Sequence, residues 1–251
     1  MNWGRFLLFI VIGFAAQIID GTLGMAYGVS CRTFLKTAAG LPSALASAVV
    51  HVAEVPTTLA SGLSHLRFRN VDKSLFWHLA IPGIIGGVAG AWFLTSIGED
   101  LEPFIDVYLI IMGFVILRKA FQKRKKERHI GKYIYPLGLA GGFLDATGGG
   151  GWGPVVTSTM LAVGHDVKKT IGTVNTVEFL VTLAETTTFV VLIRDFTSYW
   201  QTILGLIIGG VCAAPIAAWI CKKIPLRPLL AIVGLLIIAL NAYSLVQWFA
   251  I

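Results

Sequence analysis

Two glycine-rich stretches interrupt otherwise apolar sequence, and their composition suits the binding of a small anion. The stronger one is the run Gly148–Gly151, which continues through Trp152 to Pro154. In a helix interior glycine costs about 1 kcal/mol and proline about 3 kcal/mol, so this run predicts a helix break. Backbone left unpaired in lipid costs several kcal/mol per group, and it survives only where protein or a water-filled cavity satisfies it. A helix that restarts at Trp152 would present free N–H groups and a positive dipole end to an anion.

The first stretch, Gly21–Gly28, is a weaker version of the same break. Glycines can also serve close packing between membrane helices. We favour packing for scattered pairs such as Gly86-Gly87, and a ligand site for the four-glycine run. The residues predicted to line the substrate site are Gly24, Met25, Tyr27, Gly28, Arg32, Gly149, Gly150, Gly151, Trp152, Gly153, Thr173 and Asn175.

Five ionisable residues lie in apolar sequence, where charge is expensive and by default indicates function. These candidates for proton coupling are Asp20, His51, Glu54, Asp145 and Glu178. The two Asp residues precede the two breaks, so capping of a helix end is an equally good role for them. His51 lies one turn before Glu54, which suits either a His–Glu pair or an imidazole bonded to backbone. We predict no metal site and no cofactor, because the three cysteines form no C-x-x-C pair.

The elements that must position these residues are membrane helices. The chain is 56% hydrophobic and only 13% charged, against roughly 45–50% and 25% in soluble domains. Apolar runs between charged or Pro/Gly-marked loops predict helices over 3–20, 25–35, 42–64, 73–97, 101–120, 133–145, 152–163, 169–193, 199–221 and 226–249. The net charge of +7 comes from basic loops rather than a basic face, which argues against nucleic acid as a partner. No Ser/His/Asp or H-E-x-x-H arrangement supports an intramembrane hydrolase.

The two halves of the chain resemble each other. Asp20 and the break after it match Asp145 and its break at an offset of 125 residues, and Glu54 matches Glu178 at nearly the same offset. These matches predict a first repeat over 1–120, a basic linker over 121–132 and a second repeat over 133–251. Each repeat would contain a glycine-broken helical hairpin and three transmembrane helices.

Basic residues in the loops predict the orientation of the helices in the bilayer. With the linker in the cytoplasm, all Lys and Arg except Arg5, Arg32, Lys36 and Arg194 lie on the inner side. The acidic loop 98–103 then lies outside, whereas its counterpart 222–227 lies inside. The predicted fold is therefore an all-α polytopic bundle of two inverted-topology repeats, a construction common in secondary transporters, with both termini outside a cell (inner or plasma) membrane.

The motifs at the second break resemble those of the TauE/SafE sulfite exporter family. Gly142-Phe143-Leu144 leading into the glycine run, Ile171-Gly172-Thr173, and Ile81–Ala91 after Val71-Asp72 carry the resemblance, which spans both halves. It implies a multipass permease for sulfur-containing anions such as sulfite or organosulfonates. The first half departs from the family pattern at Gly24–Gly28, where a denser glycine run is usual.

We therefore expect a secondary transporter, not an enzyme, that works by alternating access with its substrate between the two breaks. Its partners would be a small anion and the lipid bilayer, and a homodimer is compatible with the sequence. Arg32, beside the first break, would favour an oxyanion. The alternatives are a proton- or cation-coupled carrier of another solute, and a membrane redox or assembly factor.

Overall fold

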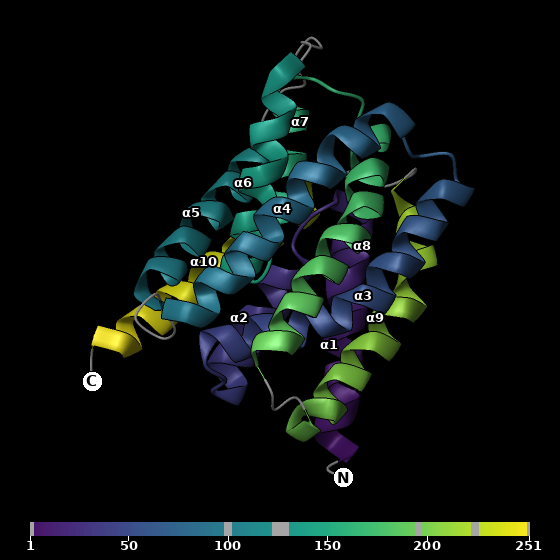
Figure 1. Cartoon of the computed structure of the whole chain (residues 1–251). Helices are drawn as coiled ribbons and strands as arrows, with labels where there is room; N and C mark the ends of the chain where they lie inside the picture. Colours follow the sequence, from purple (N-terminus) through teal and green to yellow (C-terminus); the bar gives the residue numbers. More distant parts are fainter. Residues whose placement is uncertain (1–2, 98–101, 122–130, 194–196, 222–225, 250–251) are drawn as a thin grey trace.

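The computed structural model describes residues 3–97, 102–121, 131–193, 197–221 and 226–249, and within these ranges it is a helical bundle without strands (Figure 1). The first half contains α1 (Trp3–Leu23), α2 (Tyr27–Ala39), α3 (Ser43–Arg67), α4 (Lys73–Ile97) and α5 (Glu102–Phe121). The second half contains α6 (Ile134–Gly148), the π-helical turn η3 (Gly153–Thr157), α7 (Ser158–Ala162), α8 (Val167–Leu192), α9 (Trp200–Ile220) and α10 (Leu226–Phe249). The ten helical segments expected from the sequence are all present, with bounds that differ by a few residues.

Five of the described helices, α1, α3, α4, α8 and α9, are long and apolar enough to cross a membrane. Their outward faces carry large apolar side chains, among them Val11 of α1 and Trp77, Ile81, Ile85 and Trp92 of α4. Such continuous apolar exposure is unfavourable in water and favourable against lipid. The all-α membrane fold is thus confirmed.

Each glycine break forms the tip of a helical hairpin. Gly131, just before α6, and His165, just after α7, line the same pocket. The segment α6–η3–α7 therefore enters and leaves the bundle at one end. On the other side, Leu35 and Leu41 at the end of α2 share a buried cluster with Phe9 near the start of α1. The first hairpin therefore also returns toward the end from which it started.

The packing of the helices is symmetric under exchange of the two halves. The closest pairs are α1 with α9 and α4 with α6, and each of these pairs combines the first helix of one half with the fourth element of the other. The corresponding helices α3 and α8 also pack on each other, as do α5 and α10. The α3–α8 pair is antiparallel, because Gly62 faces Thr176 whereas His51 faces Phe189. This pairing supports an inverted repeat, and the orientation of the halves across a bilayer stays a prediction. The basic run 123–126 and most of the acidic loop 98–103 lie outside the described residues.

Glycines permit the close approach of α1 to α9 and of α4 to α6. A Cβ atom on Gly209 would overlap the carbonyl oxygen of Ile10 in α1, and one on Gly86 would overlap that of Leu139 in α6. The packing role expected for Gly86 is therefore what the structure shows. Such contacts are typical of helices that associate in lipid.

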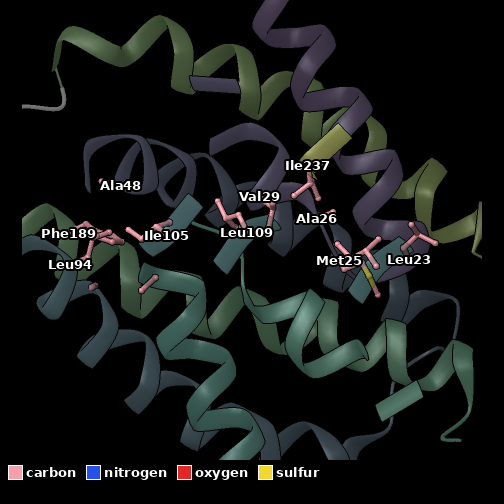
Figure 2. Packing of buried hydrophobic residues seen from close by; sticks show 13 residues of the cluster. Leu23, Met25, Ala26, Val29, Ala48, Leu94, Ile105, Leu109, Phe189 and Ile237 are labelled. Carbon is pink, nitrogen blue, oxygen red and sulfur yellow. The ribbon is translucent and has the colours of Figure 1, made fainter. Parts of the chain in front are cut away.

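A buried apolar cluster surrounds the first break and extends across both halves (Figure 2). It runs from Leu23 and Met25 past Val29 and Leu109 to Phe189. This packing fixes the start of α2 against α5 and α8. It therefore holds the irregular backbone of the break in one place.

Candidate functional site

The two breaks cross each other in direct backbone contact at the centre of the bundle. A Cβ atom on Gly28 would lie 2.5 Å from the carbonyl oxygen of Gly149 and 2.8 Å from Cα of Gly150. One on Gly153 would lie 2.5 Å from the carbonyl oxygen of Gly24. All three distances are too short for any side chain, so the crossing requires glycine at Gly28 and Gly153. The two breaks therefore meet in the structure, and the substrate site predicted between them stays a prediction.

The backbone at the crossing adopts conformations that favour glycine. Gly24 has φ of 69°, Gly149 has φ of 65° and Gly150 has φ of 146°. Ala26 also has a positive φ, 92°, although it carries a side chain. Strained residues of this kind persist where the surroundings over-determine them, and they cluster at functional sites.

Asp145 holds the second break together. Its Oδ1 accepts a hydrogen bond from the backbone N–H of Trp152 at 2.8 Å, and its carbonyl oxygen accepts from the N–H groups of Gly149 and Gly150. Three of the N–H groups expected to face an anion therefore donate to Asp145 in this conformation. One carboxylate oxygen caps the restarted helix, and the other, Oδ2, has no hydrogen-bond partner among the described residues.

Trp152 and Tyr27 occupy equivalent positions at the two helix restarts, and both side chains are buried. The indole Nε1–H of Trp152 donates to the carbonyl oxygen of Val174 at 3.2 Å, and the Tyr27 hydroxyl donates to that of Leu206 at 3.4 Å. The two rings thus anchor the restarts to α8 and α9. Their role in this conformation is to position the breaks.

Arg32 lies on α2 with its side chain fully buried at the crossing. Its aliphatic stem covers Gly149 so closely that a Cβ on that glycine would overlap Cδ and lie 2.9 Å from Cγ. Arginine stays protonated in proteins, and its planar guanidinium matches the geometry of an oxyanion. The structure therefore places a permanent positive charge beside the second break, although Arg32 follows the first in sequence.

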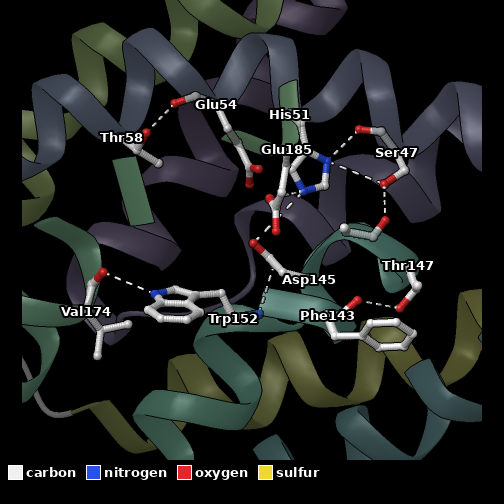
Figure 3. A network of polar contacts seen from close by, with 11 residues as sticks. Ser47, His51, Glu54, Thr58, Phe143, Asp145, Thr147, Trp152, Val174 and Glu185 are labelled. Carbon is white, nitrogen blue, oxygen red and sulfur yellow. Dashed lines mark hydrogen bonds and ion pairs between the residues drawn. The ribbon is translucent and has the colours of Figure 1, made fainter. Parts of the chain in front are cut away.

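His51 contacts two carboxylates from the other half of the chain (Figure 3). Its Nε2 lies 2.9 Å from Oε2 of Glu185 and 3.9 Å from Oδ2 of Asp145, and all three side chains are buried. Glu54, considered as a partner from its spacing on α3, lies at the crossing instead, with Oε1 3.0 Å from a Cβ built on Gly28.

Glu185 is the functional candidate that sequence reasoning missed. The two halves match as far as Ala184, and Glu185 lies one residue beyond that match, so its acid has no counterpart in the first repeat. The available signal was an acidic residue inside the apolar span of α8, and on that ground it belonged with the other buried acids.

Four more predicted site residues are buried, but they have different surroundings. Asp20 and Glu178 are buried near the crossing, and the Asp20 carboxylate makes no hydrogen bond of good geometry among the described residues. Asn175 accepts a hydrogen bond from Ser61 at 2.8 Å. Thr173, in contrast, accepts from the backbone N–H of Asp72 at 2.8 Å, so its hydroxyl fastens α8 to the loop before α4.

A multi-helix bundle with apolar outer faces and two crossed helix breaks around buried charge defines a membrane transporter. Residues 9–244 match the family described as Sulfite exporter TauE/SafE, and the chain belongs to that family. It is also 43% identical over 255 residues to the probable membrane transporter protein YtnM of Bacillus subtilis (strain 168), with 98% of this chain and 85% of that protein covered. No solved structure matches the chain.

Proposed function

We propose that this protein is a secondary transporter of small sulfur-containing oxyanions, sulfite or organosulfonates, that binds its substrate where the two breaks cross. Membership of the sulfite exporter family supports the substrate class. The observation that carries the site is Arg32, a fully buried arginine whose side-chain stem runs over Gly149 at the crossing. A charged donor in a dry site makes hydrogen bonds to an anion that are stronger than those in water.

The crossing also suits alternating access. The two tips meet at glycine backbone, with Gly28 against Gly149 and Gly150. A small displacement of one hairpin against the other would open a space there lined by glycine and by the Arg32 side chain. The two hairpins return to opposite ends of the bundle, and such a displacement would expose the same site to one end or the other.

Replacement of Arg32 tests the proposal. Arg32→Gln removes the charge, and a hydrogen bond to a charged group contributes about 1.5–3 kcal/mol, so sulfite affinity should fall about 10- to 150-fold. Arg32→Lys keeps the charge but loses the bidentate fork, so its affinity should be intermediate. Isothermal titration of the purified protein with sulfite gives the dissociation constants, and uptake into proteoliposomes gives the transport rates.

Arg5→Gln is the matched control, because Arg5 lies on the exposed part of α1. It should bind and transport sulfite like the unmodified protein. Undiminished sulfite binding by a folded Arg32→Gln variant would place the substrate elsewhere.

Proton coupling is a second component of the proposal, and Asp20 supports it. Its carboxylate is buried without a hydrogen bond of good geometry, so a proton there would relieve an unfavourable buried charge. Asp20→Asn should leave sulfite binding within about threefold but abolish accumulation driven by a pH gradient. Because Asn is as good a cap as Asp, a purely capping role predicts normal accumulation.

A further inference from the structure

His51, Asp145 and Glu185 bring their ligand atoms to one point in the interior. Each offers one nitrogen or oxygen, and these atoms all lie within 4.8 Å of one another. Imidazole nitrogen and carboxylate oxygen are the donors that zinc and related divalent ions accept in proteins, at about 2.0–2.2 Å. Small rotations of the two carboxylate side chains would close the set around a single ion.

The ligand atoms of the three groups converge on one place in the interior. Nε2 of His51 lies 2.9 Å from Oε2 of Glu185, yet neither atom makes a hydrogen bond of good geometry within the described residues. Oε1 of Glu185 and Oδ2 of Asp145 also lack partners there. A close approach without alignment is the arrangement expected of ligands around a shared cation, because ligand lone pairs are directed to the ion.

In two of the three proposed ligands, the atom that faces away from the cluster is already hydrogen-bonded to the backbone. Nδ1 of His51 lies 2.7 Å from the carbonyl oxygen of Ser47, which makes Nδ1 the protonated nitrogen and leaves Nε2 to face the carboxylates. Oδ1 of Asp145 accepts the N–H of Trp152. Metal-bound histidines and carboxylates carry such outer hydrogen bonds almost without exception.

The other half of the chain shows that helix packing does not require these charges. An offset of 124 residues relates His51 to Asn175 and Ser61 to Glu185. The contact equivalent to His51–Glu185 is therefore Asn175–Ser61, a neutral hydrogen bond of 2.8 Å between the same two helices. Since a neutral pair joins α3 and α8 at one place, the His–Glu pair at the other needs a different explanation.

From this convergence we propose that His51, Asp145 and Glu185 bind one divalent transition-metal cation of the Zn²⁺ class. Three protein ligands leave a fourth position open, as in zinc sites that exchange a water or another small ligand. Gly87 of α4 leaves room for the Glu185 side chain, since a Cβ there would lie 2.5 Å from Oε1 and 2.7 Å from Cγ. Arg32 is not one of its ligands, so the Arg32 variants test the sulfite site separately, although Asp145 contributes both to this cluster and to the second break.

Direct metal binding to the purified full-length protein, with any affinity tag removed, tests the inference. Titration calorimetry with Zn²⁺ should give one site per chain. Co²⁺, used as a coloured substitute, should develop visible absorption bands of a low-coordinate site. The double variant His51→Asn/Glu185→Ser copies the neutral pair of the other half, so it should fold and should lose both signals. Removal of a hydrogen-bond partner behind a metal ligand lowers metal affinity about 10- to 100-fold, and we expect the loss of two ligands to lower Zn²⁺ affinity by more than this.

Ser61→Ala is the matched control, because it alters the equivalent neutral pair and should retain the Zn²⁺ site. If the double variant does not elute as a single species, Glu185→Gln, which preserves side-chain size, takes its place with the same expected loss. Absence of stoichiometric Zn²⁺ and Co²⁺ binding to the unmodified protein would overturn the proposal and leave His51 and Glu185 as a pair that shares only a proton. Binding that survives the loss of both ligands would overturn it as well. Neither result bears on sulfite binding, which the Arg32 variants test.

Discussion

Substitution of Gly149 by alanine should have two effects, backbone strain at Gly149 and displacement of the buried Arg32 charge, which can be measured separately. Gly149 has φ of 65°, in the left-handed region, and a Cβ there would overlap Cδ of Arg32. The conformation costs an alanine about 1–2 kcal/mol. The overlap adds a second effect, because the Arg32 stem must move away from the crossing and take the guanidinium with it.

The two effects have different readouts. Strain lowers the stability of the folded protein, whereas displacement of Arg32 lowers sulfite affinity. If the guanidinium contributes the about 1.5–3 kcal/mol of a charged hydrogen bond, Gly149→Ala should weaken sulfite binding about 10- to 150-fold. Thermal unfolding in detergent measures the first effect, and calorimetric titration with sulfite measures the second.

Gly40→Ala is the control that isolates strain. Gly40 ends α2 with φ of 66°, almost the same as Gly149, and a Cβ there would meet nothing within 4 Å. It should lose about 1–2 kcal/mol of stability and bind sulfite normally. Equal sulfite affinities for the Gly149→Ala and Gly40→Ala proteins would refute the role given to Arg32 at the crossing.

Three further predictions concern the rest of the molecule. Gly209→Ala should separate α9 from α1 and lower the unfolding temperature, while the folded protein keeps its sulfite affinity. A variant with normal stability and reduced sulfite affinity would contradict a packing role for Gly209. Lys36→Met removes the ammonium group that bonds the 0% exposed Asp106 carboxylate at 2.8 Å, so it should lower the stability by up to about 3–5 kcal/mol, whereas the double variant Lys36→Met/Asp106→Leu should recover most of that stability. Cysteines at positions 99 and 125, which replace Glu99 and Lys125, should react with impermeant reagents from outside and inside respectively; reaction of both from one side would exclude the predicted topology.

The helices were predictable from the sequence because lipid imposes a strong constraint on it. A span needs a long apolar run, and a break needs glycine or proline, so the runs over 73–97 and 226–249 have the same bounds in the structure. The correspondence of the two breaks could also be predicted from the sequence, because Asp20 and Asp145 occupy equivalent positions in the two repeats.

The partners within the site were not predictable, because they depend on the register between helices that are far apart in sequence. His51 faces Glu185 only because α3 and α8 run antiparallel with Gly62 against Thr176. The engagement of the N–H groups of the second break by Asp145 has, in contrast, a local cause. It follows from the left-handed turn at Gly149, which folds the chain back toward the Asp145 carbonyl.

The exchange of helices between the halves determines which parts can move as rigid units. Helix α1 packs against the glycines of α9, and α6 packs against the glycines of α4. Each close pair therefore contains one helix from each half. Separation of residues 1–120 from 133–251 as two blocks would break both pairs at once. The contacts between α3 and α8 include the polar pairs Ser61–Asn175 and His51–Glu185, and we expect relative movement there instead. The closely packed helix pairs of this transporter therefore do not coincide with its sequence halves. If these pairs move as units, a cross-link between α1 and α9 should be tolerated during transport, whereas one between α3 and α8 should arrest it.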